Sequence, residues 1–271
     1  MNFLDYTFFQ YALAGLVIIS IAGAMIGTYI TTRRMVSITG GITHACFGGL
    51  GLGYFLGISP VLTAAGFAVV SALGIEGLAT RYRVREDSAI AVVWSLGMAL
   101  GILFVFLTPG YVPELNSFLF GNVLTISSVD LMAFAVYTLV VAIFLAVCRK
   151  LIVACAFDSD FARVAGLPVR VVNTLMTAIV AIGIVLTIRL IGIMLLISIL
   201  TVPVIVAEIW CRRFMPIVVL SAAIGVASSV GGLFLATVVD VPCSAMIVLL
   251  QIAVYLVSRL VFGLTMRRSM Q

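Results

Sequence analysis

One side chain in this sequence is a candidate for metal chemistry: His44, the only histidine among 271 residues. A neutral imidazole is a ligand for zinc, manganese and iron. Gly40 and Gly48 lie one helical turn before and after His44, so a helix here would leave the ring accessible. Thr43 and Cys46 are close in sequence but are not one turn away. The alternative is a packing histidine hydrogen-bonded to a backbone carbonyl, and spacing alone leaves both interpretations open.

The other residues of the sequence form no pattern that is typical of a catalytic site. The sequence contains no H-E-x-x-H motif, no G-x-S-x-G motif and no Walker nucleotide-binding loop. The five cysteines form no C-x-x-C pair and are expected to be small buried hydrophobic residues. We therefore predict a protein that is not an enzyme, although a serine paired with His44 stays formally possible.

The composition predicts the elements that position His44. The chain is 64% apolar and 9% charged, whereas a soluble domain is about 45–50% apolar and about 25% charged. So few charges cannot cover a soluble surface. The apolar residues come in long runs, unlike the alternating strands of a membrane barrel. We predict an all-α, polytopic integral membrane protein with a single transmembrane domain over residues 1–271.

Nine runs with few charges are long enough to be membrane spans. They cover residues 8–30, 35–58, 60–75, 88–107, 131–148, 171–188, 190–207, 216–239 and 242–257. The sixth and seventh runs meet at Arg189 without a loop, so one long broken helix there would change the count. Residues 115–129 are expected to form an interfacial or half-inserted helix.

The arginines predict the orientation. The clusters at 33–34, 81–85, 149–170, 212–213 and 259–268 all fall on one side of the nine-span arrangement, and the opposite loops hold one of the 15 basic residues. Since basic loops stay in the cytoplasm, we expect the N-terminus outside and the C-terminus in the cytoplasm. Scattered clusters between spans do not favour a nucleic-acid partner; they are typical of loops on one side of a bilayer.

The span that carries His44 is rich in small residues. They recur at every fourth position and would let another helix approach closely: Gly41, Ala45, Gly49, Gly53 and Gly57. The Gly40–Gly41 pair is expected to break the helix. Short, glycine-interrupted helices mark binding sites in transporters, which favours this span as the binding element.

A short amphipathic helix is expected over residues 157–168, on the cytoplasmic side. Asp158 or Ser159 can cap its start, Gly166 can end it, and Pro168 prevents its continuation. Its apolar face consists of Phe157, Phe161, Val164 and Ala165. Such a face either lies on lipid or docks into the groove of a partner protein.

Four segments together resemble the permeases of zinc/manganese-type ABC transporters. They are RRMVSITGGITHACFGGLGLG at 33–53, REDSAIAV at 85–92, SFLFGNVL at 117–124 and DSDFARVAGLPV at 158–169. The resemblance covers nearly the whole chain, and its most specific part is the histidine segment. The sequence departs from the family at Gly40 and Asn122, where the family commonly has aspartate.

The resemblance implies a permease subunit that imports a divalent metal ion, zinc, manganese or iron, with no permanently bound cofactor. It implies a second copy of the chain, a separate cytoplasmic ATPase and an extracytoplasmic solute-binding protein as partners. His44 would lie on the metal pathway, with Gly40, Thr43 and Cys46 nearby. The ATPase would be coupled through the short helix, at Asp158, Phe161, Ala162, Val164 and Gly166.

The two alternative classes of membrane protein are an ion-coupled secondary transporter and an intramembrane enzyme. An ion-coupled secondary transporter needs no ATPase, but it usually shows inverted repeats and more intramembrane carboxylates, and neither is visible here. An intramembrane enzyme would need one of the catalytic motifs that the sequence lacks. Copurification of a stoichiometric ATPase would separate the first interpretation from both rivals.

Overall fold

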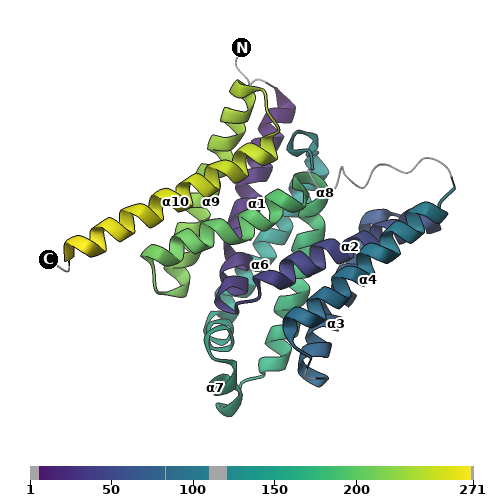
Figure 1. Cartoon of the computed structure of the whole chain (residues 1–271), viewed down its shortest axis with the longest axis horizontal. Helices are drawn as coiled ribbons and strands as arrows, with labels where there is room; N and C mark the ends of the chain where they lie inside the picture. Colours follow the sequence, from purple (N-terminus) through teal and green to yellow (C-terminus); the bar gives the residue numbers. More distant parts are fainter. Residues whose placement is uncertain (1–5, 83, 110–120, 270–271) are drawn as a thin grey trace. The chain divides into compact units, whose positions relative to one another are not determined.

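The structure is a computed structural model that describes residues 6–82, 84–109 and 121–269 (Figure 1). All regular elements in these ranges are helical, which confirms the all-α prediction. In chain order they are α1 (Thr7–Thr32), α2 (Val36–Leu56), α3 (Pro60–Arg81), α4 (Glu86–Leu107), the 3-10 helix η2 (Val123–Thr125), α6 (Ser128–Phe157), α7 (Ser159–Val164), α8 (Val169–Trp210), α9 (Phe214–Val239) and α10 (Cys243–Ser269).

Eight segments of the described chain are long and apolar enough to cross a membrane. They are Thr7–Thr32, Pro60–Ala79, Glu86–Leu107, Ser128–Phe157, Val169–Ile188, Leu190–Trp210, Phe214–Val239 and Cys243–Thr265. Eight of the nine predicted spans are therefore found. The ninth corresponds to α2, which is helical over 21 residues but whose glycines, threonines and histidine lower its hydropathy.

Contacts between the helices divide the chain into two compact units. The first unit comprises Met1–Arg34, Phe120–Arg149 and Leu190–Gln271, and the second comprises Met35–Leu119 and Lys150–Arg189. Helix α8 therefore contributes its first half to the second unit and its second half to the first. The prediction of a single transmembrane domain stays a prediction.

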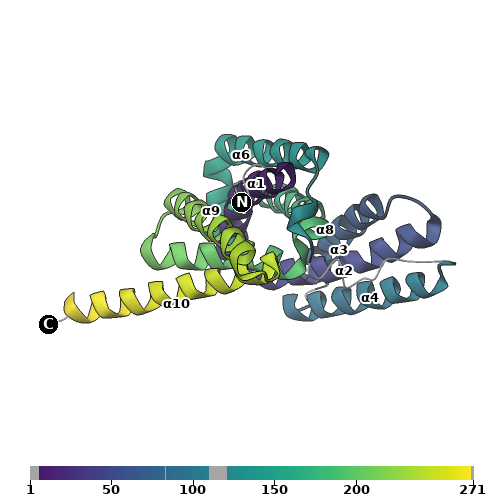
Figure 2. The ribbon, with the colours of Figure 1, turned by 90° about the horizontal axis from the view of Figure 1, so that it is seen from above.

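In the second unit, α2 lies between α3 and α4, and Figures 1 and 2 show the three helices side by side. The backbones touch where α2 has no side chain. A Cβ on Gly49 would come within 2.6 Å of the Cα of Ala64 on α3, and a Cβ on Gly101 of α4 would come within 2.6 Å of the carbonyl oxygen of Phe47. Glycines on both sides of the α2–α4 contact thus allow backbone-to-backbone packing.

In the first unit, α1 packs against α9 and against η2. Gly27 of α1 lies directly against the backbone of Leu200 in α8, and Gly15 faces the side chain of Ile126. A hydrogen bond of 3.1 Å joins the buried hydroxyls of Ser20 on α1 and Ser229 on α9. Small residues and a buried polar pair therefore hold this unit together.

Two local predictions were wrong. The Gly40–Gly41 pair does not break α2, which is continuous from Val36 to Leu56, because a helix must satisfy its own backbone hydrogen bonds inside a membrane. The helix expected over 115–129 is also absent from its described part: residues 121–127 form a loop around η2, and α6 begins at Ser128. Residues 115–120 lie outside the described ranges.

The junction of the sixth and seventh spans is one long helix with a kink. The kink lies at Gly192 (φ 76°, ψ 166°), three residues beyond the predicted hinge at Arg189. This backbone conformation is essentially restricted to glycine. Gly121, also with positive φ, packs its backbone directly against Ile191 and Gly192. The backbone conformation that only glycine adopts readily therefore places the kink at Gly192. The charge at Arg189 predicts a break three residues earlier.

The packing of α2 predicts the effect of adding a single methyl group. Gly49→Ala should destabilise the protein by about 1–3 kcal/mol, because the new Cβ meets the backbone of α3, which cannot move aside as a flexible side chain can. Thermal unfolding in detergent should show a lower midpoint. Gly66→Ala on α3 is the control: its Cβ would meet nothing within 4 Å, so its midpoint should stay equal or rise. Equal midpoints for both variants would contradict the close-packing account.

Candidate functional site

His44 lies in the first half of α2 and is half-buried in the second unit. Its ring stacks on the indole of Trp94 from α4, with centroids 4.3 Å apart and planes inclined by 4°. Phe47, one turn further along α2, lies 6.3 Å away on a nearly parallel plane. The imidazole is thus oriented by aromatic neighbours, and this orientation depends on the close approach of α2 and α4.

The Nδ1 atom of His44 is buried and has no hydrogen-bond partner. The packing alternative from the sequence, a hydrogen bond to a backbone carbonyl, is therefore not made by this nitrogen. A buried polar atom without a partner costs free energy, typically about 1–3 kcal/mol. When it carries the free lone pair of the neutral ring, this nitrogen is chemically able to bind a metal ion or a proton.

The three residues predicted to lie near His44 differ in whether they could take part in a site there. The hydroxyl of Thr43 donates a 2.5 Å hydrogen bond to the carbonyl of Thr39, so it serves its own helix. Cys46 is fully buried. Gly40 is half-buried, and a Cβ there would meet nothing within 4 Å, so the position has room for a larger side chain. Within the described residues no cluster of three or more His, Cys, Asp or Glu side chains could hold a metal ion.

Sequence reasoning missed Trp94. It follows the REDSAIAV segment and sits in an ordinary apolar run, so no local pattern distinguishes it from a lipid-facing residue. Its contact with His44 arises only because Gly97, one turn along α4, lies against the backbone of Ala45. The signal that could have found it is the combination of two glycine-bearing helices with an aromatic residue one turn from the glycine.

The short helix forms within the predicted segment 157–168 but is shorter: α7 covers Ser159–Val164, and Phe157 is the last residue of α6. Its predicted end signals are both present. The Asp158 carboxylate accepts a 2.8 Å hydrogen bond from the backbone N–H of Phe161. At the other end Gly166 has φ 77°, the N–H of Leu167 donates to the carbonyl of Ala162, and the N–H of Gly166 donates to that of Arg163. These two bonds are the Schellman pattern that terminates helices.

The surface of α7 is unusually apolar for an exposed turn. Phe161 is 69% exposed and Val164 89% exposed, whereas Ala162 is fully buried and anchors the turn. The only charged pair on α7, Arg163 with Asp160 at 3.6 Å, is exposed and contributes little to stability. A rigidly capped turn that presents two large apolar side chains is suited to contact with another apolar surface, as the sequence predicted for 157–168.

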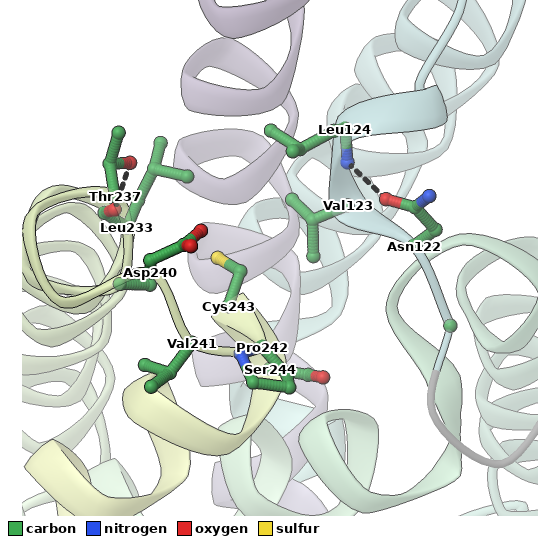
Figure 3. Close-up of a pocket in the computed structure, with 12 residues that line it drawn as sticks. Asn122, Val123, Leu124, Leu233, Thr237, Asp240, Val241, Pro242, Cys243 and Ser244 are labelled. Atoms are coloured by element: carbon green, nitrogen blue, oxygen red, sulfur yellow. Dashed lines mark hydrogen bonds between the residues drawn. The ribbon is translucent and has the colours of Figure 1, made fainter.

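A separate pocket of about 540 Å³ lies in the first unit, between the segment at η2 and the turn that joins α9 to α10 (Figure 3). In Figure 3 the carboxylate of Asp240 and the thiol of Cys243 point toward one another, and Asn122 lies on the opposite side. The Asn122 side chain accepts a 3.1 Å hydrogen bond from the N–H of Leu124 and caps η2. At this position, where the resemblance would place aspartate, an uncharged amide performs a local structural task.

The stacking of Trp94 on His44 predicts a spectroscopic response. Trp94 and Trp210 are the only tryptophans, so a Trp210→Phe background isolates the emission of Trp94. Cobalt(II), a paramagnetic ion that quenches tryptophan emission, should quench this emission if it binds the neighbouring imidazole. In Trp210→Phe/His44→Ala the quenching should disappear. Equal quenching with and without His44 would exclude a metal contact at this ring.

Comparisons with known proteins agree with this architecture. The profile of the ABC 3 transport family matches residues 5–262. A probable metal transport system membrane protein of Chlamydia pneumoniae is 35% identical, with 85% of this chain and 81% of the relative covered. The manganese transport system membrane protein MntC of Halalkalibacterium halodurans is 30% identical, with 91% and 84% covered.

The likeness extends to a solved structure. PsaBC from Streptococcus pneumoniae, determined in complex with an antibody fragment, superposes with a TM-score of 0.83 at 25% identity, covering 94% of this chain and 92% of that one. The profile match over nearly all residues, together with this fold, places the chain in the ABC 3 transport family, as a membrane-spanning permease subunit.

Proposed function

We propose that this permease subunit imports a divalent metal ion across a bacterial-type inner membrane, with His44 on the ion's path. The observation that carries the proposal is the imidazole itself: the chain's only histidine sits on a glycine-rich helix, and its Nδ1 is buried without a partner. Relatives named for metal and manganese transport support the cargo class. Manganese, zinc and iron all accept an imidazole ligand.

The site differs from a strong metal trap in a way that suits transport. A single neutral imidazole offers no negative charge to offset a divalent ion in a low-dielectric environment. The ion therefore needs a further ligand from a second copy of the chain or from another helix, or it binds only in transit. Weak binding favours release, as conduction requires.

ATP hydrolysis belongs to a partner chain in this proposal. A separate cytoplasmic ATPase would dock on α7, where Phe161 and Val164 offer apolar contact and Gly166 fixes the end of the turn. A solute-binding protein would deliver the ion from the outside to a homodimer of permeases. The arginine clusters support an orientation with the N-terminus outside and α7 in the cytoplasm.

Uptake of radiolabelled manganese, zinc and iron into vesicles that contain the whole transporter tests the metal path. His44→Ala should lower uptake by about tenfold or more, since each tenfold corresponds to roughly 1.4 kcal/mol of lost interaction. Basal ATPase activity and assembly should be unchanged. Uptake at the parent rate would make His44 a packing residue. ATP-independent uptake would instead favour an ion-coupled carrier.

A second substitution tests the missing carboxylate. Gly40→Asp places a carboxylate one turn from His44, at a position with open space, and should tighten metal retention and slow turnover. The control Gly40→Ala changes the backbone preference without adding charge, by about 0.5–1 kcal/mol. If both Gly40 variants retain metal equally, the carboxylate is not part of the site.

The coupling role of α7 is tested by Phe161→Asp. The side chain is exposed, so the permease should fold, but the charge should weaken an apolar contact with the ATPase. The variant should lose the ATPase during purification and lose ATP-driven uptake. Arg163→Gln on the same helix, which alters only a weak exposed ion pair, should retain both. Normal ATPase binding by Phe161→Asp would remove α7 as the coupling element.

A further inference from the structure

A groove with a distinctive charge pattern lies in the first unit, at the end of α8 that precedes α9. Its volume is about 310 Å³, and α8 and α10 form its walls. Glu208 and Arg212 line one side, and Tyr255, Arg259 and Phe262 of α10 line the other. This groove belongs neither to the His44 site nor to α7, both of which are in the second unit.

The two arginines are available for a ligand. Arg212 and Arg259 are both exposed, and neither forms an ion pair with a carboxylate of the described chain, Glu208 included. Two guanidinium groups and one carboxylate leave one net positive charge in the groove. Guanidinium groups match phosphate oxygens with paired, charge-assisted hydrogen bonds. A phosphodiester with one negative charge therefore complements this groove.

The surroundings of the groove match the level of lipid headgroups. Trp210 at the end of α8 packs edge-on against Phe262, with ring centroids 5.8 Å apart, and Tyr255 faces the groove. Tryptophan and tyrosine gather at the boundary between hydrocarbon and water. The charged end of the groove therefore lies where the phosphate of a lipid would be found.

The neighbouring face of α10 is suited to acyl chains. Only 11% of the α10 span is buried. Ile252, Leu256 and Leu260 recur at every fourth residue beside the groove and are 42%, 55% and 68% exposed. A charged groove that continues into an exposed apolar stripe is complementary to an amphiphile, whose charged head and apolar chains would both be in contact. A soluble phosphate would contact only the charged end.

We propose that this groove binds an anionic phospholipid, with its phosphate between Arg212 and Arg259 and its acyl chains along α10. Basic pockets between transmembrane helices bind acidic headgroups on this principle. Glu208 and the Tyr255 hydroxyl are placed to bond hydroxyl groups of a headgroup such as glycerol. The lipid would join α8 to α10 beside the contact of Trp210 with Phe262.

Native mass spectrometry of the delipidated permease tests this assignment. The probes are phosphatidylglycerol, phosphatidylcholine with the same acyl chains, and glycerol 3-phosphate. Phosphatidylglycerol should bind at least about tenfold more tightly than either of the others, because only it combines net negative charge with acyl chains. Equal binding of glycerol 3-phosphate would overturn the lipid in favour of a soluble phosphate site, and equal binding of phosphatidylcholine would remove the role of charge.

Substitutions in the groove test whether the lipid binds between Arg212 and Arg259. Arg212→Gln/Arg259→Gln should abolish the preference for phosphatidylglycerol, and Arg259→Lys should retain part of it. The matched control Arg149→Gln/Lys150→Gln removes two exposed basic residues of α6, which do not line the groove, and should keep the preference. If the Arg212/Arg259 variant keeps the full preference for phosphatidylglycerol, the groove is not the lipid site. A thermal melt of each variant without lipid verifies that it is folded.

Discussion

The contact on which the second unit depends is the backbone-to-backbone packing of α2 against α3 and α4. Gly49 touches the backbone of Ala64, and Gly101 touches that of Phe47, so no flexible side chain separates the helices. Close packing of this kind replaces the hydrophobic effect, which offers no driving force between helices in lipid. It also sets the distance at which Trp94 stacks on His44. The position of the one imidazole is therefore a consequence of glycine placement along two helices.

Much of the architecture is predictable because the bilayer imposes it. Charge-free runs of sufficient length become helices, since a membrane interior leaves the backbone no other way to bond its polar groups. The end signals of α7 worked for a local reason: Asp158 bonds an N–H three residues ahead, and Gly166 adopts a positive φ whatever surrounds it. Helix ends of this kind are predictable because the interactions that form them involve residues close together in the sequence.

Features set by distant contacts could not be predicted. Gly40 and Gly41 carry a helix-breaking composition, yet α2 continues through them because its neighbours and its own hydrogen bonds stabilise the helix. The kink of α8 falls at Gly192, where Gly121 packs against the backbone from a segment about 70 residues away in sequence. Trp94 meets His44 only after two helices have packed. The metal-path role of His44 and the coupling role of α7 stay predictions.

The most direct test of the account is the metal-edge X-ray absorption spectrum of the permease loaded with zinc or manganese. The protein should be purified without a histidine tag, so that His44 is the only source of imidazole. We expect the multiple-scattering signature of one imidazole ligand in the parent and its loss in His44→Gln, which preserves the packing volume more closely than alanine. An imidazole signature absent from the parent, or a spectrum that His44→Gln leaves unchanged, would contradict the placement of the metal path at α2.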